Sequence, residues 1–79
     1  MDIERELESY IREKFEIGDD PDLTQDTHLF DEGFVDSLGA VEIVCFIEEK
    51  FEIQITQKDL TLYPMNTINE IAEVVKSKL

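Results

Sequence analysis

The chain has 79 residues with 20 acidic and 7 basic side chains, and its net charge of −13 disfavours nucleic acid and anionic membrane surfaces while favouring basic protein partners. Its 42% hydrophobic content suffices for the core of a single small domain, residues 1–79. The single cysteine excludes an internal disulfide, and no apolar run is long enough to span a membrane. The first residues lack the basic and apolar regions of a signal peptide, so we expect a cytoplasmic monomer.

Residues 2–17 are predicted to form the first helix, which Gly18 is expected to end. Apolar side chains recur there at steps of three and four, which places them on one face. These residues are Ile3, Leu7, Tyr10, Ile11 and Phe15. The following residues, 18–35, are predicted to form a long connection, because Pro21 blocks continuation of the helix.

Apolar residues in this connection are expected to anchor it in the core, and Gly33 is expected to supply a turn. The expected anchors are Leu23, Leu29, Phe30, Phe34 and Val35. Several aspartates in the segment invite comparison with a calcium-binding EF-hand loop. The pattern fails because Gln25 stands where that loop requires glycine, so no metal site is predicted.

A second helix is predicted over residues 37–51, with Asp36 as its N-cap because aspartate accepts hydrogen bonds from free helix N–H groups. Ser37 then lies in the first turn with an exposed hydroxyl, where the positive end of the helix dipole favours an anionic group. The residues predicted to face inward are Leu38, Val41, Val44, Cys45, Ile47 and Phe51, and Cys45 is interpreted as a small buried hydrophobe. Ile43 and Phe46 are expected to add core contacts, and the residues predicted to point outward are Glu42, Glu48 and Glu49.

A short third helix is predicted from residue 56 to about residue 62, where Pro64 ends it. The last helix opens with a capping box formed by Thr67 and Glu70. Its apolar positions are Ile68, Ile71, Ala72, Val74, Val75 and Leu79. Together these elements predict an all-α fold, a small four-helix bundle with three main helices and a long first loop.

Residues 29–51 read LFDEGFVDSLGAVEIVCFIEEKF. This stretch resembles the acyl carrier protein family, whose members are the phosphopantetheine-dependent carriers of acyl, aminoacyl and peptidyl groups. The resemblance rests on Asp-Ser-Leu at residues 36–38, the Leu-Phe pair and glycine before it, the valine and glutamate after it, and the Glu-Glu pair followed by phenylalanine. It continues to the C-terminus.

The resemblance implies that a phosphopantetheinyl transferase joins 4′-phosphopantetheine from coenzyme A to Ser37. Asp36 would then serve both transferase recognition and helix capping. The arm's thiol would carry cargo as a thioester. The family's docking surface for basic patches of synthase, ligase or transferase enzymes falls on Asp36, Leu38, Glu42, Glu48 and Glu49.

Two further features bear on which cargo the chain would carry. The family often has an acidic residue two positions after the modified serine, where this chain has Gly39. Acyl cargo would be held between the helices, in a possible cavity whose expected lining is Val41, Val44, Ile47, Leu62, Ile68 and Ile71. The ordinary role of these six residues is to fill the core.

The leading expectation is a carrier without enzymatic activity that delivers acyl intermediates in fatty-acid, polyketide or related biosynthesis. An alternative is an aminoacyl (for example D-alanyl) or peptidyl carrier loaded by an adenylating ligase, which Asp-Ser-Leu-Gly and the preceding Phe-Asp-Glu-Gly-Phe also resemble. A further alternative is an acidic helical interaction module that is never modified. An enzyme is disfavoured, because nothing in the sequence marks His28 as a base for Ser37.

Overall fold

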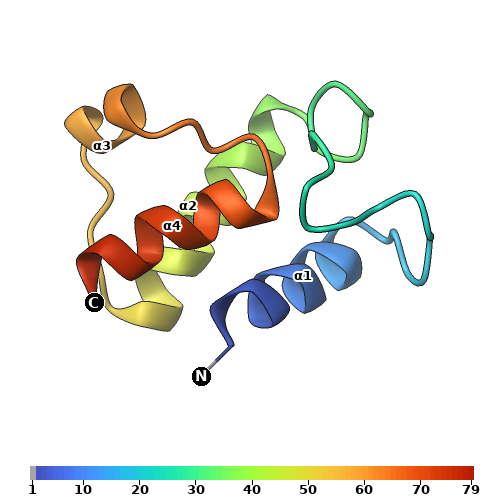
Figure 1. Cartoon of the computed structure of the whole chain (residues 1–79), viewed down its shortest axis with the longest axis horizontal. Coiled ribbons are helices and arrows are strands. Elements are labelled where there is room, and N and C mark those ends of the chain that lie inside the picture. Colours follow the sequence, from blue (N-terminus) through green and yellow to red (C-terminus); the bar gives the residue numbers. More distant parts are fainter. Residues whose placement is uncertain (1) are drawn as a thin grey trace.

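The computed structural model describes residues 2–79, so Met1, which the sequence prediction placed in the same domain, lies outside the described residues. Four helices follow one another along the chain: α1 (Ile3–Lys14), α2 (Ser37–Phe51), α3 (Gln57–Leu62) and α4 (Ile68–Lys78) (Figure 1). Because residues 2–79 contain no strand, the all-α prediction is confirmed. None of the helices in this range is long and apolar enough to cross a membrane.

Helix α1, by contrast, is shorter than predicted. Asp2 caps its start by accepting a hydrogen bond from the Arg5 amide at 3.0 Å. The helix ends at Lys14 instead of residue 17, because the backbone of Glu16 is left-handed, with φ of 56°. The amides of Ile17 and Gly18 turn back to the Arg12 carbonyl oxygen, at 2.9 and 3.3 Å, and this arrangement closes the helix end.

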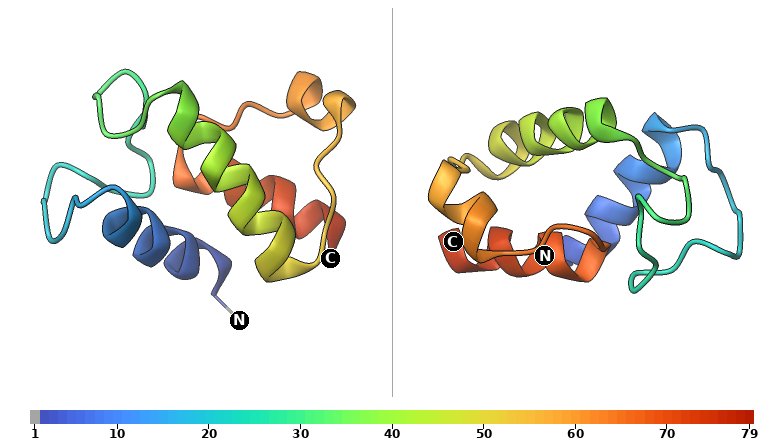
Figure 2. Two further views of the ribbon diagram at one scale, coloured as in Figure 1. Left: turned by 180° about the vertical axis from the view of Figure 1, so that it is seen from behind. Right: turned by 90° about the horizontal axis from the view of Figure 1, so that it is seen from above.

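Helices α1, α2 and α4 enclose a continuous apolar core. Figure 2 shows α2 on one side of the bundle and α4 on the other, and α1 packs beside α4. The buried core side chains are Ile3, Leu7, Ile11, Leu23, Leu29, Val35, Ile43, Ile47, Phe51, Ile68, Ile71, Ala72, Val74 and Val75. The prediction for α4 is therefore confirmed at every apolar position except Leu79, which is exposed.

The long connection before α2 is held in place by one arginine of α1. Arg12 donates hydrogen bonds to the carbonyl oxygens of Gly18, Asp20 and Leu23, at 2.6, 3.1 and 2.8 Å. The residues predicted to anchor this connection are confirmed as buried or half-buried core contacts. Gly33 turns the chain with φ of 79°. Within the described residues, no group of three or more His, Cys, Asp or Glu side chains is placed to hold a metal ion.

The orientation of α2 differs from the sequence prediction. Its buried row is Gly39, Ile43, Ile47 and Phe51. The predicted inward positions of Leu38, Val41 and Cys45 are wrong, since Leu38 and Val41 are 74% and 60% exposed and Cys45 is also exposed. Apolar residues surround the first half of α2, so their spacing alone did not define its inner face.

Candidate functional site

Ser37 is the first residue of α2, and its side chain is exposed. The preceding Asp36 has extended backbone angles, and its Oδ1 accepts a hydrogen bond from the Gly39 amide at 2.8 Å. This bond satisfies one of the free N–H groups at the helix start. The N-cap prediction for Asp36 is confirmed, and its bond holds the turn that presents the Ser37 hydroxyl.

The start of α2 differs from the other helix starts in its charges. Acidic residues occupy the first turns of α1 (Glu4 and Glu6), α3 (Asp59) and α4 (Glu70). The first turn of α2 contains none. Because a helix N-terminus carries partial positive charge, an anionic group added to Ser37 would be stabilised there, next to the capping carboxylate of Asp36.

Gly39 is buried against residues that lie outside its own helix. A Cβ atom at this position would lie 2.7 Å from Val35 Cγ1 and 2.8 Å from Phe15 Cε1. Any larger residue would therefore require those side chains to shift. The absence of an acidic side chain two positions after Ser37 thus has a packing reason, which the sequence signalled only as a glycine inside a helix.

The exposed face of α2 carries both apolar and acidic residues. Its members are Leu38, Val41, Glu42, Cys45 and Glu49. On its α1 side this face is bounded by Tyr10, whose ring stacks on Phe46 with centroids 3.7 Å apart. Four of the predicted docking residues, Asp36, Leu38, Glu42 and Glu49, are therefore accessible to a partner.

Glu48 is placed differently from the other predicted docking residues. It was predicted to point outward, but its side chain is half-buried. Its Oε2 accepts a hydrogen bond from the Ile55 amide at 2.9 Å, in the connection between α2 and α3. Glu48 therefore fixes this connection, a contact that the charge pattern of α2 did not reveal.

A cavity of about 290 Å³ opens between α2, α3 and the segment that follows α3. The residues that line it are Phe30, Ala40, Ile43, Val44, Leu60, Tyr63, Pro64, Met65, Asn66 and Ile71. Ala40 lies three residues after Ser37, so the cavity begins about 4.5 Å along the helix axis from the serine.

Only Val44 and Ile71 of the six predicted cavity residues belong to the lining. Ile47 and Ile68 are fully buried elsewhere in the core. Val41 and Leu62 point away into solvent, because α2 is rotated from its predicted orientation and α3 turns Leu60 toward the cavity. Much of the lining comes from residues 63–66, which no periodic pattern marked.

His28 makes its polar contacts within its own loop. Its Nδ1 accepts a hydrogen bond from the Asp31 amide at 3.0 Å, and its Nε2 lies 3.7 Å from Asp31 Oδ2. Both ring nitrogens are therefore directed at Asp31. The polar contacts of the His28 ring in the described residues are thus with Asp31 and not with Ser37.

The family model described as "Phosphopantetheine attachment site" matches residues 5–75. The chain belongs to the phosphopantetheine-dependent carrier proteins. The cofactor of this carrier is covalently attached 4′-phosphopantetheine.

Several curated proteins similar to this carrier are named D-alanyl carrier protein. The D-alanyl carrier protein of Streptococcus sanguinis is 37% identical over 75 residues, which are 95% of this chain and 92% of that protein. The D-alanyl carrier protein of Streptococcus gordonii is 36% identical over the same shares. That of Streptococcus uberis is 42% identical over 52 residues, 66% of each chain.

Proposed function

We propose that this carrier bears an amino acid, D-alanine, on a phosphopantetheine arm attached to Ser37. The observation that supports this cargo is the similarity to D-alanyl carrier proteins along nearly the whole chain. The proposal therefore follows the aminoacyl alternative of the sequence analysis in preference to a role in fatty-acid or polyketide synthesis. An adenylating ligase would supply the activated amino acid.

The residues at the start of α2 fit the attachment of the arm. The exposed Ser37 hydroxyl would form the phosphodiester, and the partial positive charge of the helix N-terminus would stabilise its negative charge. Asp36 uses Oδ1 to hold the Gly39 amide, which leaves its other oxygen available to a transferase. When bound, the arm supplies a terminal thiol that holds the cargo as a thioester.

The exposed face of α2 is the proposed docking surface for the transferase and the ligase. Leu38 and Val41 offer apolar contacts, and Glu42 and Glu49 offer negative charge to basic partner surfaces. Charge reversal by Glu42→Lys with Glu49→Lys is expected to slow loading roughly tenfold at low salt, because these charges steer association. The matched control, Asp19→Lys with Glu73→Lys, makes the same change of net charge at exposed sites outside α2. Equal loading rates for both pairs would contradict the docking proposal.

Loading assays test the proposed cargo directly. We expect the phosphopantetheinylated protein to gain the mass of one alanyl group when it is incubated with ATP, D-alanine and a D-alanine-adenylating ligase. The competing candidate is an acyl carrier, which the apolar cavity of about 290 Å³ favours. Its assay replaces the ligase and amino acid with an acyl ligase and a fatty acid. Efficient acyl loading together with no alanyl loading would overturn the aminoacyl proposal.

A further inference from the structure

Ser37 lies in a turn that is closed by two hydrogen bonds. The Asp36 side chain accepts one from the Gly39 amide at 2.8 Å, and the Asp36 carbonyl oxygen accepts one from the Ala40 amide at 3.0 Å. Both bonds span Ser37, whose own side chain is exposed. The position of the Ser37 hydroxyl therefore depends on where Gly39 and Ala40 lie.

Gly39 rests on two side chains from outside α2. A Cβ atom at residue 39 would lie 2.7 Å from Val35 Cγ1, and 2.8 and 3.1 Å from Cε1 and Cζ of Phe15. Carbon atoms that are not bonded to each other pack at about 3.5–4.0 Å, so the backbone of α2 fits here only because residue 39 has no side chain. Phe15 and Val35 thus form a seat for the first turn of α2.

Both members of the seat are fixed by backbone contacts. Phe15 follows the last residue of α1, and its amide bonds to the Ile11 carbonyl oxygen at 3.1 Å. Val35 is 4% exposed, and its amide bonds at 3.1 Å to the carbonyl oxygen of Leu29, which is fully buried. The C-terminal end of α1 and the start of α2 lie at the same end of the bundle (Figure 2). The seat therefore ties the turn that contains Ser37 to the end of α1.

We propose that Phe15 is a positioning residue for the Ser37 hydroxyl and acts on it through Gly39. The proposal rests on the attachment of the arm to Ser37. In that reaction the Ser37 oxygen bonds to the phosphorus next to pantetheine, and the bond from this phosphorus to the adenosine 3′,5′-bisphosphate leaving group breaks. The hydroxyl proton passes to a base of the transferase. Because the attacking oxygen must be aligned with the leaving group, a small shift of the turn slows this step.

Phe15→Ala tests the seat with coenzyme A and a broad-specificity phosphopantetheinyl transferase. We expect kcat for attachment to fall roughly tenfold, because the acceptor oxygen is no longer held in one place. The KM for the carrier should stay within about twofold, because the exposed face of α2 is unaltered. In the unmodified chain, hydrogen exchange at the Gly39 and Ala40 amides should accelerate roughly tenfold, while the Val75 amide in the core of α4 stays protected.

Gly39→Ala tests the same contact from the side of α2, because its two effects have opposite signs. Alanine favours a helix more than glycine does, so without the seat this change should slow exchange at the Ala40 amide and leave kcat unaltered. With the seat, the added methyl group meets Phe15 and Val35 and displaces the turn. We then expect faster exchange at Ala40 and a kcat lowered roughly tenfold. Slower exchange with an unaltered kcat would overturn the proposal.

Ile53→Ala is the matched control for a general loss of stability. Ile53 is also half-buried against the core, but it lies in the connection between α2 and α3. Its replacement should leave kcat and the exchange of Ala40 unchanged at a temperature where every variant is folded by circular dichroism. The proposal fails if Phe15→Ala keeps the original kcat, if it raises KM alone, or if Ile53→Ala lowers kcat equally.

Phe15→Leu serves if Phe15→Ala does not fold at the assay temperature. It keeps the core filled and removes the ring atoms nearest Gly39, so the same fall in kcat with little change in KM is expected. An arm mapped to a residue other than Ser37 would refute the proposed attachment site. Exchange at Ala40, measured on the unmodified chain, would in that case still show whether Phe15 holds the turn.

Discussion

Replacing Ser37 with alanine is expected to abolish phosphopantetheine attachment. The substitution removes the proposed acceptor oxygen at the start of α2 and leaves the hydrogen bond between Asp36 and the Gly39 amide intact. Because Ser37 is exposed, the stability of the fold should change by no more than about 0.5 kcal/mol. The loss of modification would therefore reflect the missing hydroxyl and not unfolding. Intact mass after incubation with coenzyme A and a broad-specificity phosphopantetheinyl transferase measures the effect.

Ser9 provides the matched control for this experiment. It is also an exposed serine, but it lies inside α1 and not at a helix start. Ser9→Ala should gain one phosphopantetheine group as fully as the unaltered chain does. Attachment that persists in Ser37→Ala would show that Ser37 is not the modified residue, and attachment that disappears in Ser9→Ala as well would show that the loss is not specific to the Ser37 hydroxyl.

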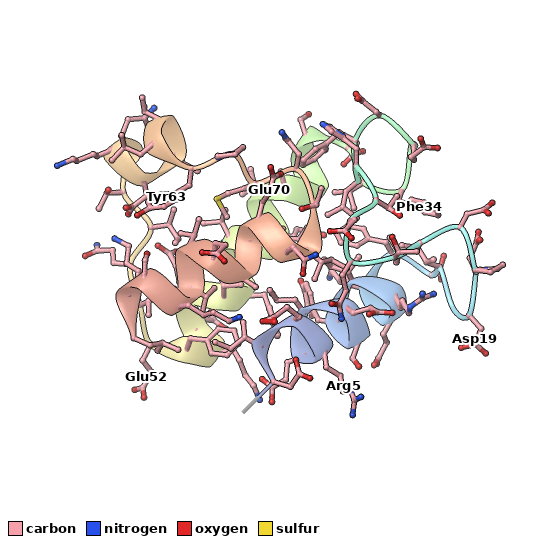
Figure 3. The ribbon with its side chains drawn as sticks, in the orientation of Figure 1. Arg5, Asp19, Phe34, Glu52, Tyr63 and Glu70 are labelled. Carbon is pink, nitrogen blue, oxygen red and sulfur yellow. The ribbon has the colours of Figure 1, made fainter. Side chains whose placement is uncertain are left out.

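Ile71→Asp is expected to unfold the bundle. Ile71 is 1% exposed, lies on the inner face of α4 and lines the cavity. Figure 3 labels its neighbour Glu70 on the same helix. A buried carboxylate without a partner costs more than about 4 kcal/mol, whereas a chain of this size has a total stability of about 4–12 kcal/mol. Circular dichroism during heating should show no cooperative transition, or one at a much lower temperature.

Leu79→Asp separates the effect of burial from that of added charge. It makes the same type of change next to the last turn of α4, at a side chain that is 68% exposed. Its melting temperature should stay close to that of the unaltered chain. A cooperative transition in Ile71→Asp near that of Leu79→Asp would remove Ile71 from the core.

The starts of the helices could be predicted because the contacts that define them are local. Asp36 reaches the Gly39 amide, and Thr67 and Glu70 complete a capping box within a single turn. Such side chain–backbone bonds depend only on the order of a few residues. The placement of Ser37 at the start of α2 followed from the same reasoning.

The inner face of α2 could not be predicted, because residues distant in the sequence decide it. Gly39 packs against Phe15, and this contact directs the row that includes Ile43 into the core. Leu38 and Val41 then lie in solvent despite their apolar character.

The lining of the cavity and the role of Glu48 likewise depend on contacts made by residues that follow α2. The cavity exists because of where α3 and residues 63–66 lie, which only the tertiary structure determines. The carboxylate of Glu48 is occupied by the Ile55 amide, which follows the end of α2. The attachment of an arm to Ser37 came from family resemblance, and the geometry of α2 is compatible with it.

The most direct measurement of the central proposal is the intact mass of this protein isolated from its native cell, with fragment mapping. The proposal predicts phosphopantetheine on Ser37 and, in a fraction of the molecules, the additional mass of one alanyl group on the thiol. An unmodified chain, or an arm on another residue, would contradict the assignment of Ser37. A fatty acyl group in place of alanine would contradict the proposed cargo and leave the attachment site standing.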